Sequence, residues 1–214
     1  MDLFYILLGL FLLVVLAIFL YLLYSGLFYT YTIRCAIPAS IPNRFAYTFY
    51  IGPYQKIGSA CWRLCSIVPR STIFVVYYDN PDKVAKKDHD QLRAAVCCPL
   101  LPEPSPSLES RLMDEGYKIG TFPNCTKALI TEFPYRTSTS IMIAVSRVYP
   151  SLVEYIKDYK LEDSCGPCIE VYKDDSIQFV WILEPKDGFA IPQLPPPPPL
   201  IEEPPASKET KKDQ

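Results

Sequence analysis

Hydrophobic and polar positions divide the chain into an apolar run, a long region of mixed periodicity and a proline-rich end. The run from Leu3 to Tyr24 carries no charged residue, and its length matches the roughly 20 apolar residues that cross a bilayer core as a helix. A secretory signal has a shorter apolar region behind a basic segment, whereas here Asp2 precedes the run and no Lys or Arg does. The pattern predicts an uncleaved membrane anchor over residues 1–25, with a cleaved signal peptide as the alternative.

Charged residues beside the run predict its orientation. Arg34, Arg44 and Lys56 follow the run, and basic residues flanking a membrane span tend to stay in the cytosol. We therefore expect a lumenal N-terminus and a cytosolic position for the bulk of the chain. The glycosylation sequon that begins at Asn124 provides a test, because it is usable only if this part of the chain is lumenal.

The pattern from residue 45 to 185 predicts two similar halves, each with a strand, a helix and two further strands. In the first half, strands are expected at Phe45–Ile51, at the nearly all-apolar Ser71–Asp79 and near Leu92–Pro99. Pro53 suits the start of a helix after the first of these strands. That helix would bury the apolar residues that recur at helical spacing: Ile57, Ala60, Cys61, Leu64 and Cys65.

The second half repeats this order, with two strands instead of one before its first helix. It has four expected strands, of which the last two form a hairpin: Tyr117–Phe122, Thr126–Phe133, Cys168–Tyr172 and Ile177–Leu183. A helix is expected at Ser138–Val148 with Ile141, Met142 and Val145 facing inward, and Pro150 would begin another helical segment. A loop with a short helix at Ser107–Glu115 would join the halves. The predicted fold class is α+β, with antiparallel strands and helices on one face.

Composition sets apart the segments on either side of residues 45–185. Residues 26–44 are an expected juxtamembrane connector. Residues 186–214 contain the run LPPPPPL and are expected to be a disordered tail with polyproline II character. Proline runs are commonly spacers. As the alternative, a polyproline-binding domain would contact the prolines of this run: Pro195, Pro196, Pro197, Pro198 and Pro199.

Charge and cysteine content narrow the possible chemistry. The formal net charge of −2 gives no reason to expect a nucleic-acid partner. The adjacent Cys97 and Cys98 suggest small buried hydrophobes in a reducing compartment rather than a disulfide framework. Cys165 and Cys168 form the CGPC tetrapeptide of thioredoxin-like redox sites, but they follow a helix instead of beginning one, so we expect a turn. We expect no zinc site among these four cysteines, no other metal and no cofactor, because the spacing suits tetrahedral ligation poorly and His89 is the only histidine.

Three stretches carry a resemblance to a known domain. In chain order, they are FAYTFYIGPYQKIGSACWRL, FVVYYDNP and CIEVYKDDSIQFVWIL. They resemble the first strand–helix unit, the second strand and the closing hairpin of the gyrase-inhibitor-like (GyrI-like) domain, which also serves as the effector-binding module of bacterial regulators. The resemblance implies two β-α-β-β halves over residues 45–185, with a concave face between them that binds small, often cationic, aromatic molecules.

On this resemblance, Glu170 supplies the countercharge for such a molecule. Strand alternation places Glu170 and Tyr172 on one face. It places Ile169 and Val171 on the opposite, helix-packed face. Tyr50 and Trp181, together with Tyr172, are the candidate aromatic partners of a bound cation. The alternative is that Glu170 is solvated or pairs with a lysine. Some soluble relatives hydrolyse bound molecules, but no nucleophile–base pair is evident, so we expect no catalytic residues and no enzyme.

A second resemblance also includes the apolar run. It is a resemblance to the testis-expressed protein 264 family, carried by that run and by four further stretches: YSGL, YYDNP, FPYRTSTSIMIAVSRVYPSLVEYIKDYKL and IEVYKDDSIQF. The family implies a single-pass receptor or adaptor, anchored in the endoplasmic reticulum membrane through residues 3–24, with a cytosolic GyrI-like domain. Its implied partners are ubiquitin-like autophagy modifiers, in selective autophagy of the reticulum (reticulophagy), and the valosin-containing AAA ATPase, in protein–DNA adduct repair.

The end of the chain departs from this family pattern. The modifier-binding motif is aromatic-x-x-aliphatic among acidic residues, and it is not found after Pro185, where Phe189 is the only aromatic residue. The alternative function is therefore a membrane-tethered binder or sensor of small apolar cations in the groove of the GyrI-like domain.

Overall fold

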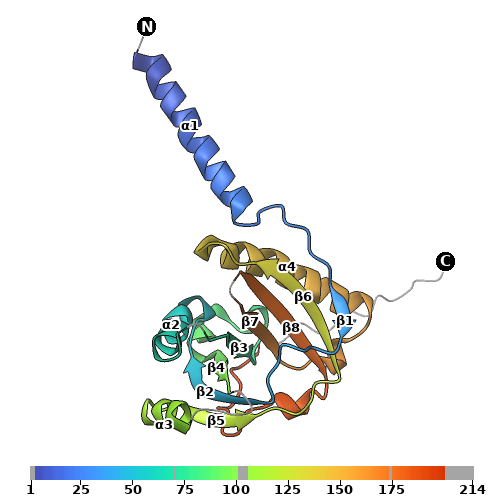
Figure 1. Ribbon diagram of the computed structural model, residues 1–214. Helices are drawn as coiled ribbons and strands as arrows, with labels where there is room; N and C mark the ends of the chain where they lie inside the picture. Colours follow the sequence, from blue (N-terminus) through green and yellow to red (C-terminus); the bar gives the residue numbers. More distant parts are fainter. Residues whose placement is uncertain (1–2, 70, 101–105, 174, 201–214) are drawn as a thin grey trace, which may run out of the picture.

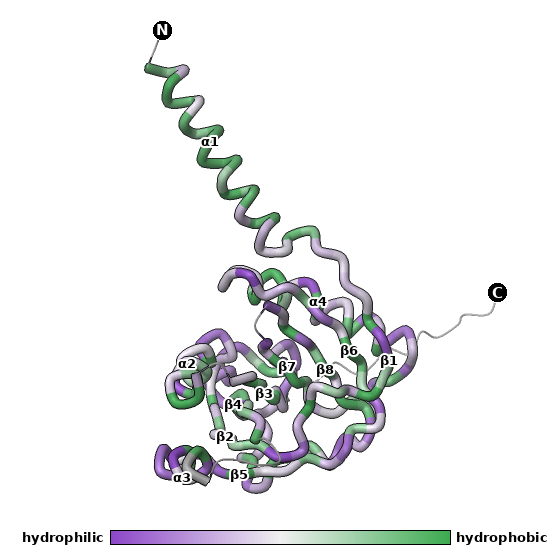
Figure 2. Tube along the Cα trace, viewed as in Figure 1, coloured by the Kyte–Doolittle hydropathy of each residue, from purple (hydrophilic) through white to green (hydrophobic). Residues whose placement is uncertain are grey.

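The structure consists of an isolated N-terminal helix and a domain built from one sheet and its covering helices. It is a computed structural model that describes residues 3–69, 71–100, 106–173 and 175–200. The helix, α1 (Leu3–Tyr24), stands away from the domain, and none of its residues is buried (Figure 1). Figure 2 shows that its trace is hydrophobic along most of its length. Among the described residues it is the one helix that is long and apolar enough to cross a membrane.

An eight-stranded antiparallel sheet forms the centre of the domain. Its strands are β1 (Arg34–Ala36), β2 (Arg44–Ile51), β3 (Ile73–Tyr77), β4 (Arg93–Pro99), β5 (Lys118–Thr121), β6 (Lys127–Pro134), β7 (Cys168–Tyr172) and β8 (Ser176–Glu184). The strand order is β1-β6-β8-β7-β3-β4-β2-β5, and every pairing is antiparallel. The expected α+β class is confirmed.

The three α-helices that the structure describes in the domain pack on one face of the sheet. They are α2 (Gly58–Ile67), α3 (Pro106–Asp114) and α4 (Ser138–Asp158). α2 and α3 cover the first half of the sheet, where Leu64 and Leu112 are fully buried. α4 covers the second half (Figure 1). The order β2-α2-β3-β4 thus recurs as β6-α4-β7-β8, and the two halves join where β3 pairs with β7.

α4 runs continuously through Pro150, where two helical segments were expected. A proline inside a helix removes one backbone hydrogen bond and crowds the preceding turn. Here Val148 and Leu152, one on each side of it, are both fully buried against the sheet, which stabilises the helix across the defect. Of the expected inward positions, Ile141 is partly buried and packs against the cluster beneath α4, whereas the other two were wrong. Met142 and Val145 are 73% and 41% exposed, because the buried stripe runs through Val148 and Leu152.

The opposite face of the sheet is covered by the chain's own C-terminal segment, with no α-helix of the described residues on it. Phe189 is fully buried, and Ile191 is 3% exposed. The Phe189 ring lies 4.7 Å from the Phe122 ring, centroid to centroid. Both belong to a cluster of alternate strand residues that includes Phe45, Tyr47, Phe74, Val76, Ala95, Cys97, Ile169, Val171, Val180 and Ile182.

This packing corrects the disordered tail that was expected from residue 186. The sequence argument weighed the prolines and missed the two apolar side chains, Phe189 and Ile191, that insert into the core. The correction covers residues 186–200. The same expectation for residues 201–214 lies outside the described residues.

The expected connector, residues 26–44, is also part of the domain. Its strand β1 pairs with β6 at the sheet edge. The Tyr31 hydroxyl donates a hydrogen bond to the Arg147 carbonyl oxygen of α4 at 2.7 Å. In return, the Arg147 guanidinium donates to the carbonyl oxygens of Gly26 and Leu27 at 3.2 and 2.9 Å. The chain that follows α1 is therefore held on α4 rather than forming a free linker.

Replacing Phe189 with alanine tests whether the C-terminal segment belongs to the core. Loss of this fully buried side chain is expected to lower the free energy of unfolding by about 3–5 kcal/mol. Denaturant unfolding of the full chain in detergent, followed by tryptophan fluorescence, measures the change. Leu200→Ala is the matched control, because that side chain is 64% exposed. Unchanged stability of the Phe189 variant would contradict the packing.

Candidate functional site

A buried carboxylate lies at the seam between the two helix-covered halves of the sheet. Glu170 is on β7, which pairs with β3 at the junction of the halves, and it is 3% exposed. Of the described residues that are buried, it is the only Asp, Glu, Lys or Arg. Its strand neighbour on the same face, Tyr172, packs against the clusters beneath both α2 and α4. The carboxylate therefore sits where neither helix alone provides the cover.

Three tyrosine hydroxyls from three elements donate hydrogen bonds to this carboxylate. Tyr149 of α4 donates to Oε1 at 2.7 Å. Tyr77 of β3 and Tyr172 of β7 donate to Oε2 at 3.0 and 2.5 Å. The ion pairs found among the described residues do not include Glu170. A buried carboxylate is thus satisfied by neutral donors instead of a cation.

Burial and hydrogen bonding shift the Glu170 pKa in opposite directions. Desolvation raises the pKa of this carboxyl, the hydroxyls of Tyr172, Tyr149 and Tyr77 lower it, and the pKa remains above its ordinary value. Burial, reinforced by nearby negative charge, raises the pKa of all three tyrosines well above the usual phenol value. The tyrosines therefore remain hydroxyl donors at neutral pH.

Strand alternation was right that Glu170 and Tyr172 share a face but wrong about which face it is. Tyr172 packs in the helix-side clusters, and Glu170 bonds to α4. Ile169 and Val171 lie on the opposite face, in the cluster that contains Phe189. Alternation fixes which residues share a face, whereas the position of the helices decides which face they cover.

The other two predicted site residues are tied to backbone groups. The Tyr50 hydroxyl donates to the Pro53 carbonyl oxygen at 2.8 Å and closes the corner between β2 and the helix that follows. Trp181 Nε1 donates to the Gly166 carbonyl oxygen at 2.9 Å. The Trp181 ring lies 6.4 Å from the Tyr149 ring, so it borders the tyrosine cluster.

Tyr77 and Tyr149 are the site residues that the sequence did not reveal. Tyr77 ends the apolar strand β3, and Tyr149 follows the buried Val148 of α4. At such positions a tyrosine is ordinarily a core residue. Only the packing of α4 over the sheet brings their hydroxyls to one carboxylate.

The CGPC tetrapeptide lacks the electrostatics of a redox site. Burial raises the pKa of the Cys165 thiol to about 11, and burial likewise raises that of Cys168. A redox nucleophile needs a lowered thiol pKa. The Gly166 amide donates to the Ile182 carbonyl oxygen at 2.8 Å, and the Ile182 amide donates to the Pro167 carbonyl oxygen at 3.2 Å. The tetrapeptide therefore runs extended beside β8 and leads into β7, in place of the turn that was expected. No group of three or more metal-ligating side chains occurs in the part of the chain that the structure describes.

A polar junction joins α1 to the first turn of α4. The Tyr21 hydroxyl lies 2.9 Å from Thr139 Oγ1, and the Ser25 hydroxyl lies 2.8 Å from Thr137 Oγ1. Ser25 is fully buried, and Thr137 caps the N-terminus of α4. These contacts set the position of α4 relative to the end of α1.

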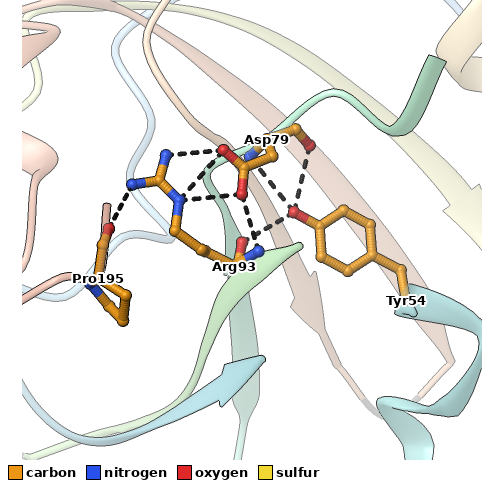
Figure 3. Close-up of polar contacts among 4 residues, drawn as sticks. All are labelled: Tyr54, Asp79, Arg93 and Pro195. Atoms are coloured by element: carbon orange, nitrogen blue, oxygen red, sulfur yellow. Dashed lines mark hydrogen bonds and ion pairs between the residues drawn. The ribbon is translucent and has the colours of Figure 1, made fainter. Parts of the chain in front are cut away.

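A largely buried ion pair holds the proline run on the domain (Figure 3). Arg93 Nη2 and Nε lie 2.7 and 3.0 Å from the two carboxylate oxygens of Asp79, and both side chains are largely buried. The Tyr54 hydroxyl donates to the Arg93 carbonyl oxygen at 2.8 Å. Arg93 Nη1 then donates to the Pro195 carbonyl oxygen at 2.6 Å. Of the other predicted proline contacts, Pro198 is buried and three are exposed: Pro196, Pro197 and Pro199.

Glu170→Gln is expected to change how stability depends on pH. Because burial raises the Glu170 pKa in the folded protein, the wild type loses stability as pH rises from the unfolded pKa, about 4.3, through the folded pKa. The glutamine variant does not ionise there, so its stability relative to the wild type should increase across this window.

Urea unfolding at a series of pH values from about 3 to about 8 measures this difference. Glu154→Gln, at an exposed position of the same helix that carries Tyr149, is the control and should show no such increase. A difference between Glu170→Gln and the wild type that stays constant with pH would contradict the raised pKa.

Comparisons with known proteins identify relatives of the chain. No protein-family model matches it. A mouse protein, testis-expressed protein 264 homolog (Mus musculus), is 36% identical over 175 residues, which are 80% of this chain and 55% of the relative. Human testis-expressed protein 264 (Homo sapiens) is 35% identical over 191 residues, which are 87% of this chain and 59% of the relative. The chain thus spans less than two thirds of the length of either relative.

One solved structure is a distant match. An uncharacterized conserved protein from Listeria innocua gives a TM-score of 0.40 at 7% identity, over 71% of this chain and 91% of that chain. No conclusion about this chain rests on it. On the two sequence matches, the chain belongs to the testis-expressed protein 264 family.

Proposed function

We propose that the protein is a non-enzymatic, membrane-anchored adaptor that displays a GyrI-like domain at the cytosolic face of the endoplasmic reticulum. The observation that carries the proposal is α1, which is charge-free and apolar yet left bare by the domain. A helix with this surface is stable when lipid replaces water around it. The two β-α-β-β halves that meet at β3 and β7 support the GyrI-like assignment.

The junction between α1 and α4 supports display of the domain close to the bilayer. Tyrosines are enriched where a membrane span meets water, and Tyr21 lies in the last turn of α1. Because Tyr21 and Ser25 contact the first turn of α4, a spanning α1 would hold that turn at the membrane surface. The anchor would then set the orientation of the domain as well as its location.

The compartment and the partners are further parts of the proposal. Flanking charge and family membership support a lumenal N-terminus and a cytosolic domain in the endoplasmic reticulum membrane. Family membership also supports roles in reticulophagy, through autophagy modifiers, and in recruitment of the valosin-containing AAA ATPase to protein–DNA adduct repair. The relatives extend beyond the matched region, so a modifier-binding motif in them need not fall within the segment matched here.

The tyrosine-held carboxylate favours a second candidate function, the binding of a small apolar cation. Glu170 offers one negative charge among the rings of Tyr77, Tyr149 and Tyr172. A cation is attracted both to a carboxylate in a low dielectric and to aromatic faces. Because Glu170 is only 3% exposed, a ligand would have to move at least one of the covering tyrosines to reach the carboxylate.

Two charges placed in α1 test the anchor. In the double variant Leu12→Arg with Leu13→Arg, each arginine should raise the free energy of membrane insertion by about 2.5–3.5 kcal/mol at the bilayer centre. The variant protein should therefore be released from membranes on alkaline extraction. Leu200→Arg, outside the helix, should leave it in the membrane pellet. In microsomes, Asn124 of the wild type should remain unglycosylated. Wild-type protein recovered as soluble would contradict the anchor, and a sugar on Asn124 would contradict the cytosolic topology.

Binding of a cationic aromatic dye tests the second function. Glu170→Gln removes the charge but keeps the side-chain size, and the loss of a charged contact should weaken binding about tenfold or more. Glu154→Gln, at an exposed position, is the control and should bind the dye as the wild type does. Fluorescence polarisation of the dye measures the affinity. Equal affinity of the Glu170 variant and the wild type would eliminate this role.

A further inference from the structure

The proline strap, defined here as residues 195–200, has a burial pattern with a period of three. Residues of a polyproline II helix repeat every three positions, so Pro195 and Pro198 lie on one edge. Pro198 is buried and Pro195 is half-buried, whereas Pro196, Pro197 and Pro199 are exposed. This is the pattern of a polyproline II helix that rests on the domain along one of its three edges.

Contacts at both ends fix the register of the strap. At its start, the Pro195 carbonyl oxygen accepts a hydrogen bond from Arg93, whose guanidinium is itself held by Asp79 (Figure 3). At its end, Leu200 forms an antiparallel bridge with Val84, which is 2% exposed. The strap therefore cannot rotate about its own axis without breaking a contact at one end.

The segment before the strap is shaped to deliver it to this position. Ile191 is inserted in the core beside Phe189. Gln193 has a left-handed backbone with φ of 65°, and the Leu194 amide donates to the Ile191 carbonyl oxygen at 3.2 Å, which closes a turn. Lys118 Nζ donates to the Gln193 side-chain oxygen at 2.7 Å. The turn redirects the chain from the core onto the surface.

We propose that the strap is a preformed ligand for a polyproline-binding domain with an aromatic-lined groove, which grips the two outward edges while the inward edge stays on this protein. The outward edges are Pro196 with Pro199, and Pro197 with Leu200, whose side chain is 64% exposed. Aromatic-lined grooves bind proline-rich segments in this extended form. Because the register is already fixed, the partner orders little chain on binding, which favours affinity.

The chemistry of the strap specifies how such a partner would recognise it. Residues 195–200 carry no charge, so recognition rests on ring packing. Because prolines have no N–H group, the backbone of the proline run offers a partner only hydrogen-bond acceptors, its carbonyl oxygens. These suit tyrosine or tryptophan donors in the groove. The inference does not depend on the membrane anchor or on the Glu170 cluster.

Two double variants of identical composition separate the outward edge from the inward edge. Pro196→Ala with Pro199→Ala changes one outward edge. Pro195→Ala with Pro198→Ala changes only the edge that faces this protein. Isothermal titration calorimetry would measure binding of the detergent-solubilised full chain to three purified domains with aromatic grooves: a WW domain, an EVH1 domain and profilin. Circular dichroism would check that each variant keeps its fold.

We expect at least one of the three domains to bind the wild-type chain. The outward double variant should weaken that binding roughly tenfold or more, because central aromatic contacts of this kind carry most of an interface's affinity. The inward double variant should weaken it less. A synthetic peptide of residues 191–200 should bind more weakly than the full chain, because it lacks the clamp.

Any of three results would overturn the proposal. The first is that none of the three domains binds. The second is that the outward variant binds as well as the inward variant. The third is that the inward variant or the free peptide binds more tightly than the wild-type chain, which would mean that the strap must leave the domain before a partner can reach it.

Discussion

Both faces of the eight-stranded sheet are apolar, and the need to cover each of them determines the rest of the structure. Helices supply the cover on one face. On the other face, the described chain supplies its own C-terminal segment, with Phe189 fully buried among alternate residues of the strands. An antiparallel sheet commonly leaves one face to water. Here the C-terminal segment is folded structure because the second face would otherwise expose an aromatic cluster.

The helices on one face and the C-terminal segment on the other each position one candidate interaction site. Two separate helices over one sheet leave a seam, and Glu170 occupies it with three tyrosine hydroxyls as its donors. Such a carboxylate is satisfied but desolvated, which makes it a proton-sensitive position and a possible countercharge. The C-terminal segment leaves the core after Ile191 and continues along the surface. There Arg93, which is paired with Asp79, donates a hydrogen bond to Pro195 and holds the prolines in place. The same closure of the sheet thus positions both candidate interaction sites.

The sequence predicted the elements better than their arrangement. An apolar run of β-branched and aromatic residues is sufficient to indicate β3, and a polar turn between two such runs indicates the β7–β8 hairpin. The side of the sheet that a strand residue faces depends on where the helices pack, so the facing of Glu170 was assigned wrongly. Pro150 suggested a helix start, although burial on both sides carries α4 through it. The tail was misjudged because composition describes its many prolines and not the single aromatic ring that is buried.

The central claim, that the C-terminal segment closes the helix-free face, has a direct test in the magnetic environment of Phe189. The Phe189 and Phe122 ring centroids are 4.7 Å apart. Nuclear Overhauser spectroscopy of the full chain in detergent micelles, with labelled phenylalanine, would report this proximity. The account predicts cross-peaks between the two rings and Phe189 resonances shifted by neighbouring aromatic groups. Phe189 resonances at random-coil positions, without cross-peaks to Phe122, would contradict it.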